Sequence, residues 1–216
     1  MNIKNVRIGF LWLHREYIKD EFNDVQMIER LEFYQENNVN VLMTIDLKSL
    51  PEWTKPLSNE AFIKEYEQVI DHILEVYGDQ LSMIQLGNEW DWEIDLFLEG
   101  NIDLLIQMNN ILYEKANQNL DVVLGSISIG GVRALAFDDK QLSNVYFNTG
   151  PLYTEDEIEK YSNQIENTVL YANRILNECL YDYVDLHLYD DYWNWSLYYE
   201  TFVKLLPNKT KVIVTE

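Results

Sequence analysis

Short apolar runs alternate along the chain with longer segments in which apolar residues recur at helical spacing. The short runs predict β-strands, because strands cover about four to eight residues and helices are longer. They cover residues 6–13, 39–45, 83–89, 121–127, 183–188 and 211–215. The longer segments predict helices, because their spacing places the apolar side chains on one face. They cover residues 25–36, 59–77, 101–116, 154–179 and 196–206.

This alternation predicts a parallel α/β sheet whose neighbouring strands are joined by helices. No linker divides the chain, so we expect residues 1–216 to form one domain. A closed barrel of eight strand-helix units needs about 250 residues, and this sequence supplies about six units. The segment 128–153 is Gly-rich and too long for a plain connection, so we expect a loop over the active face.

Polar or flexible residues at helix boundaries predict where two of the helices begin and end. Asp24 and Ser58 each precede a helix and are expected to cap it. Gly78 follows the helix 59–77 and is expected to close it in the left-handed conformation.

Side chains capable of chemistry gather near the ends of the predicted strands. In chain order they are Arg7, Asn88, Glu89, His187, Tyr189 and Glu216. The carboxyl ends of parallel strands meet at one edge, where barrel enzymes carry their catalytic groups. Neighbours in a regular strand point to opposite faces. Asn88 and Glu89 can therefore serve one cleft only if their strand stops or bulges there.

Two glutamates at separate strand ends match the needs of glycoside hydrolysis. One carboxyl group protonates the leaving oxygen, and the other attacks the sugar or activates water. Structural roles are the alternative for the remaining residues. Arg7 would then form an internal ion pair, and His187 would be a half-buried residue with satisfied hydrogen bonds.

The acidic composition narrows the choice of partner. The chain has 16 Lys and Arg against 37 Asp and Glu, a formal net charge of -21. Such a charge repels phosphate backbones and anionic lipid, so a nucleic-acid partner is not expected. The 6 Trp and 15 Tyr offer faces for stacking on a neutral sugar, although core packing accounts for more than half of them.

Other functional classes lack their signatures. No glycine-rich dinucleotide or P-loop motif follows the first strand, and no Gly-x-Ser-x-Gly elbow occurs. Cys179 is the only cysteine, which excludes an intramolecular disulfide and a Cys-rich metal site. No apolar run approaches the roughly 20 residues that a membrane span needs.

Residues 84–89, Ile-Gln-Leu-Gly-Asn-Glu, and 211–216, Lys-Val-Ile-Val-Thr-Glu, resemble two motifs of the clan A glycoside hydrolases. These are retaining enzymes on a (β/α)₈ TIM barrel, and the motifs end their fourth and seventh strands. Residues 6–12 are similar to the second-strand motif whose Arg supports the nucleophile, and 51–53, Pro-Glu-Trp, to the turn after the third strand. The resemblance implies an incomplete barrel that lacks the first and eighth strands.

The resemblance also implies roles for individual residues. Glu89 would be the general acid/base, with a pKa raised by burial beside Trp90 and Trp92. Glu216 would be the nucleophile, about 5 to 5.5 Å from Glu89 as in retaining enzymes. The expected substrate-binding residues are Arg7, Trp53, Asn88, Trp90, His187, Tyr189 and Trp193. The substrate would be a glycoside, an oligosaccharide or a polysaccharide, and no metal or cofactor is expected.

Two other functions are compatible with the same residues. Glu89, His187 and Glu216, with Asp185, could bind a divalent metal as in a sugar isomerase-like barrel. Arg7, aimed at the site, would repel such a cation. The other alternative is a non-catalytic carbohydrate-binding relic.

The missing strands predict that the chain is a fragment with impaired turnover. An unclosed barrel would leave two strand edges able to pair with another copy. The first residues contain no signal-peptide core, which indicates a cytoplasmic protein if the chain is complete. A fragment leaves the location unassigned.

Overall fold

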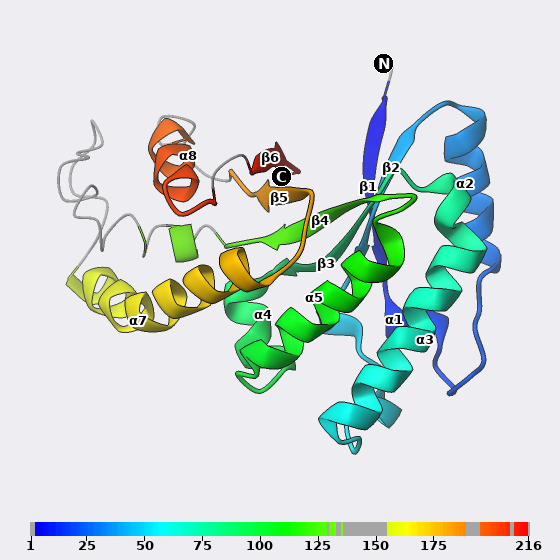
Figure 1. Cartoon of the computed structure of the whole chain (residues 1–216), viewed down its shortest axis with the longest axis horizontal. Coiled ribbons are helices and arrows are strands. Elements are labelled where there is room, and N and C mark those ends of the chain that lie inside the picture. The colour runs from blue at the N-terminus through cyan, green and yellow to red at the C-terminus, as the bar shows by residue number, and fades with distance from the viewer. Residues whose placement is uncertain are drawn as a thin grey trace.

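Six parallel strands form one sheet in the order of the sequence, as predicted (Figure 1). The computed structural model describes residues 3–128, 130–132, 135, 155–188, 195–207 and 210–215, with side chains of 155–165 omitted. The strands are β1 (Asn5–Phe10), β2 (Asn40–Ile45), β3 (Met83–Glu89), β4 (Asp121–Ser126), β5 (Tyr183–Leu186) and β6 (Lys211–Val214). Every neighbouring pair is parallel.

Helices connect the strands and cover the outer face of the sheet. They are α1 (Trp12–Arg15), α2 (Val25–Glu36), α3 (Asn59–Tyr77), α4 (Trp90–Phe97), α5 (Ile102–Ala116), α7 (Glu155–Glu178) and α8 (Trp195–Val203). In Figure 1, α3 and α5 run side by side, and α5 also contacts β3, β4 and α7. No helix in the described ranges is long and apolar enough to cross a membrane.

The two faces of the sheet differ in chemistry, as strand alternation requires. The outward-pointing side chains are apolar and buried against the helices. They include Phe10, Met43, Ile84, Val122 and Val184, all 0% exposed. The inner face carries the polar side chains that form the site described below.

The inner face encloses space, as in a barrel that is not closed. A cavity of about 560 Å³ is lined by residues of β1, β2, β3 and β6. β1 and β6 are the two ends of the sheet, so the sheet curves until both ends border one cavity. The fold is therefore an incomplete barrel of the TIM type.

β3 bulges near its carboxyl end, one of the two possibilities that the sequence left open. The pairing of β3 with β4 is regular to Leu86 and then shifts before Glu89. Gly87 lies in this shift with φ 67°, a left-handed conformation that glycine adopts readily. The bulge changes which face the following side chains occupy.

The helix boundaries follow the sequence in part. The Ser58 hydroxyl accepts a hydrogen bond from the Ala61 N–H, as expected of a cap. The Gly78 prediction is wrong, because Gly78 has φ -49° and begins a 3₁₀ turn. Asp24 precedes α2 but makes no cap. Its carboxylate instead accepts from Tyr77 and lies 3.1 Å from His72 Nε2.

Candidate active site

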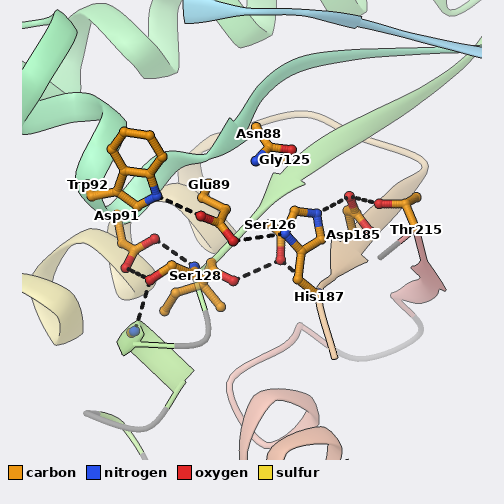
Figure 2. A network of polar contacts seen from close by, with 12 residues as sticks. Asn88, Glu89, Asp91, Trp92, Gly125, Ser126, Ser128, Asp185, His187 and Thr215 are labelled. Carbon is orange, nitrogen blue, oxygen red and sulfur yellow. Dashed lines mark hydrogen bonds and ion pairs between the residues drawn. The ribbon is translucent and has the colours of Figure 1, made fainter. Parts of the chain in front are cut away.

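Glu89, at the end of β3, is held by two hydrogen bonds. Its Oε1 lies 3.0 Å from His187 Nδ1, and its Oε2 accepts from the indole N–H of Trp92 at 2.7 Å (Figure 2). The side chain remains 13% exposed. The carboxyl group is therefore fixed in direction and still reachable from the solvent.

The pKa of Glu89 is lowered, whereas the sequence led us to expect a raised pKa. Burial acts to raise the pKa, but the hydrogen bonds from His187 and Trp92 and the charges of His187 and Lys48 together lower it. Stabilisation of the ionised form by donors and cations outweighs desolvation here. The prediction of a raised pKa is corrected for the protein without a ligand.

His187 follows β5 and is completely buried between two carboxyl groups. Nδ1 faces Glu89, and Nε2 lies 3.1 Å from Oδ2 of Asp185 (Figure 2). The backbone N–H of His187 donates to the Ser126 hydroxyl at 3.0 Å. Both ring nitrogens of His187 therefore face a carboxyl oxygen.

Asp185 is the junction of the polar contacts on the inner face. It is fully buried, and its Oδ2 accepts from Gln85 Nε2 at 3.2 Å and from the Thr215 hydroxyl at 2.6 Å. The same oxygen faces His187. Asp185 thus joins β3, β5 and the residue after β6.

Arg7 joins this network from the other end of the sheet. Its Nε donates to the Thr44 hydroxyl at 2.9 Å, and the hydroxyl donates to Gln85 Oε1 at 3.2 Å. The guanidinium also donates to Oδ1 of Asn88. A cavity of about 360 Å³ lies beside these groups, lined by Arg7, Ile8, Gly9, Thr44, Asp46, Lys48, Asn88 and Thr215. A ligand in this cavity would meet Arg7 and Asn88 directly.

Two further carboxyl groups lie in α4, just after Glu89: Asp91 is half-buried and Glu93 is fully buried. Burial raises the pKa of Asp91 to about 6, although the hydroxyl and N–H of Ser128 both donate to it. Burial also raises the pKa of Glu93 to about 7. Neither residue was singled out from the sequence.

Two of the predicted aromatic contacts lie away from this network. Trp90 is 1% exposed, and its indole N–H donates to the Gly125 carbonyl at 2.7 Å. Trp90 therefore packs in the core, which corrects its expected role in binding substrate. Trp53 donates to the Glu16 carbonyl at 3.2 Å and packs edge-on against Trp12 at 5.9 Å. It does not line the cavity beside Arg7.

Of the two tryptophans expected beside Glu89, Trp92 is the one that donates a hydrogen bond to it. Besides its bond to Glu89, its ring lies 5.0 Å from the Lys48 ammonium and packs against Phe97. Tyr189, Trp193 and Glu216 fall outside the described residues, as does most of the segment 128–153. Their roles, and the distance between Glu89 and Glu216, remain predictions.

Within the described ranges, no group of three or more His, Cys, Asp or Glu side chains is arranged to hold a metal ion.

Comparison with known proteins identifies the fold class. No family model and no curated protein sequence matches the chain. Solved structures do match, among them the GH1 β-glucosidase of Exiguobacterium antarcticum B7, with 11% identity and a TM-score of 0.53 over 85% of this chain. A glucosidase of Croceicoccus marinus matches with 13% identity and a TM-score of 0.55 over 99%. The AHE enzyme of Alicyclobacillus herbarius matches with 11% identity and a TM-score of 0.53 over 86%.

The chain spans about half the length of these structures, which it covers to 50%, 45% and 50% respectively. At such low identity the likeness defines the fold alone. The chain therefore has the fold of an incomplete TIM barrel.

Proposed function

We propose that this protein is a glycoside hydrolase that cleaves O-glycosidic bonds with retention, through a covalent glycosyl-enzyme intermediate. The observation that carries the proposal is the position of Glu89. Its carboxyl group ends a barrel strand, is held by His187 and Trp92, and follows Asn88 at the rim of a cavity. Support for a sugar substrate comes from the glucosidase-like fold.

In the first step, the Glu216 carboxylate attacks the anomeric carbon while the bond to the leaving oxygen breaks. Glu89 gives its proton to that oxygen, so the aglycone leaves as an alcohol. In the second step, Glu89 takes a proton from water, which attacks the anomeric carbon and releases Glu216. Because the surroundings lower the pKa of Glu89, the protonated acid is most abundant at acidic pH.

Asn88 and Arg7 are proposed to act on the sugar and the nucleophile. The guanidinium of Arg7 occupies Oδ1 of Asn88, which leaves the amide N–H₂ of Asn88 to donate to the sugar 2-hydroxyl. Such a contact strengthens in the transition state. The positive charge of Arg7 would keep the Glu216 carboxylate ionised.

The test is hydrolysis of a panel of aryl glycosides by the unaltered chain and by Glu89→Gln, Glu216→Gln and the exposed control Glu29→Gln. We expect Glu89→Gln to lose about 100-fold or more in kcat/KM on a phenyl glycoside, since general acid catalysis contributes about 10²–10⁴-fold. The loss should be smaller on a 2,4-dinitrophenyl glycoside, whose leaving group needs no proton. Full activity of Glu89→Gln on both substrates would disprove the assignment.

The covalent intermediate of a retaining mechanism can be tested separately, even if turnover is slow. A 2-deoxy-2-fluoroglycoside with a good leaving group should label the protein covalently, and mass spectrometry should find the label on Glu216. If the label is found on another residue, that residue and not Glu216 is the nucleophile. Proton NMR identifies the anomer of the sugar that is released before mutarotation. If that first product has the inverted configuration, the retaining mechanism is ruled out.

A further inference from the structure

Glu93 is a buried carboxyl group with one evident task. It lies in the first turn of α4 and is 0% exposed. Its Oε2 accepts the backbone N–H of Asn88 at 2.9 Å. Its Oε1 has no hydrogen-bond partner among the described residues. A buried carboxyl group with one unpaired oxygen costs folding free energy, so its presence here needs a reason beyond packing.

The carboxyl group of Glu93 fits against the bulge of β3. A Cβ atom added to Gly87 would lie 2.9 Å from Glu93 Oε2. The left-handed glycine therefore leaves the space into which the carboxyl group reaches. The carboxyl group of Glu93 fills the space beside Gly87 and accepts the hydrogen bond of the Asn88 N–H.

The bulge decides where the site residues point. In a regular strand, Asn88 and Glu89 would face opposite sides of the sheet. With the bulge, Asn88 reaches Arg7 of β1 and Glu89 reaches His187 after β5. Both side chains thus enter the same polar network on the inner face.

We propose that Glu93 is a positioning residue of the glycosidase site. Its carboxyl oxygen fixes the Asn88 peptide in the bulge and so sets the directions of the Asn88 and Glu89 side chains. The high pKa of Glu93, about 7, reflects the burial that this task requires. The kinetic consequence rests on the proposed function, whereas the effect on the Asn88 peptide does not.

The experiment compares Glu93→Leu, which has no acceptor, with Glu93→Gln, whose carbonyl oxygen can still accept the Asn88 N–H. Asn109→Leu is the matched structural control. Asn109 is 1% exposed and donates to the carbonyl of Leu180, between α7 and β5, at 2.8 Å. Unfolding in urea shows how far each variant is destabilised.

We expect kcat of Glu93→Leu to fall about 100-fold on an aryl glycoside, the loss associated with misplacing a catalytic group by about 1 Å. KM should change less than about threefold, because Asn88 acts chiefly in the transition state. Glu93→Gln should stay within about fivefold of the unaltered protein, and Asn109→Leu should keep its kcat. Equal losses in Glu93→Leu and Asn109→Leu at equal stability would overturn the proposal.

A second readout does not depend on turnover. Hydrogen exchange of the Asn88 amide, followed by ¹⁵N NMR, should become at least about 100-fold faster in Glu93→Leu and stay slow in Glu93→Gln. Unchanged exchange in Glu93→Leu would overturn the positioning role. If the protein hydrolyses no glycoside but shows this exchange pattern, the proposed function is wrong and the positioning role of Glu93 stands.

Discussion

At the scale of single residues, the site is defined by carboxyl groups in different environments. Glu89 is stabilised as an anion by His187 and Trp92. For Glu93, four residues later, burial raises the pKa, and the opposing charge of Lys48 does not offset it. The same side-chain type is therefore driven in opposite directions within one turn of helix, which is how proteins assign different protonation states to neighbouring acids.

The environment of Glu93 predicts a dependence of stability on pH. The pKa of Glu93 rises from 4.5 to about 7 on folding, so between these pH values the folded state holds more protons than the unfolded state. Stability then falls as pH rises through this window, by about 3 kcal/mol in all. Glu93→Gln lacks this titration. Its free energy of unfolding relative to the unaltered protein should increase by that amount from pH 4.5 to pH 8, as measured by urea unfolding.

The control for this measurement is Glu29→Gln on the exposed surface of α2. Its difference from the unaltered protein should hardly change over the same pH range. A pH-independent difference for Glu93→Gln would mean that Glu93 titrates normally in the folded protein.

Prediction from the sequence at this scale succeeded for residues whose contacts are set by strand ends. Arg7, Asn88, Glu89 and His187 do meet in one hydrogen-bonded network. The choice of Trp90 over Trp92 failed because α4 was not predicted. With a helix beginning at residue 90, Trp90 and Ile94 lie one turn apart on the buried face.

At the scale of elements, β3 is the strand that departs most from regularity. The apolar run 83–89 was sufficient to predict the strand, and the Asn-Glu pair suggested that it stops or bulges. The choice between the two required the position of Glu93, which comes from the following helix. The Gly78 prediction failed for a related reason, since the chain after α3 continues into a 3₁₀ turn and needs no left-handed residue.

Gly87 provides a prediction about this element. Gly87→Ala places a Cβ atom 2.9 Å from Glu93 Oε2 and forces alanine to φ 67°. We expect a loss of about 1–3 kcal/mol in the free energy of unfolding, measured by urea denaturation. Gly78→Ala is the matched control, because Gly78 has φ -49° and nothing within 4 Å of an added Cβ. Gly78→Ala should be neutral or stabilising by about 0.4–1 kcal/mol. Equal effects of the two substitutions would show that the bulge at Gly87 is not strained by a side chain.

At the scale of the whole molecule, the inner face is polar and the total charge is strongly negative. The alternation of short apolar runs and helical segments was enough to predict six parallel strands in barrel order. Each segment indicates its own secondary structure, and a helix between two strands favours a parallel arrangement. The links among Thr44, Gln85, Asp185 and Thr215 were not predicted as a network. They depend on which strands become neighbours across the barrel, and a local pattern does not encode that.

The net charge of -21 predicts a response to salt. Carboxylates repel one another more strongly in the compact folded state than in the unfolded chain, and dissolved salt screens this repulsion. The melting temperature should therefore rise between 20 mM and 500 mM NaCl. Potassium chloride at equal ionic strength should give the same rise, since screening does not depend on the identity of the cation. A constant or falling melting temperature would show that local ion pairs outweigh the general repulsion.

The polar network also has a consequence for the order in which the molecule folds. The partners of its contacts are far apart along the chain, by 81 residues for Arg7 and Asn88, 98 for Glu89 and His187, and 100 for Gln85 and Asp185. Closing such long loops is slow, and local helices and adjacent strands form sooner. The first three strands can build their apolar face before residue 187 has left the ribosome. The carboxyl group of Glu89 is therefore oriented last, when the second half of the chain brings His187 into place.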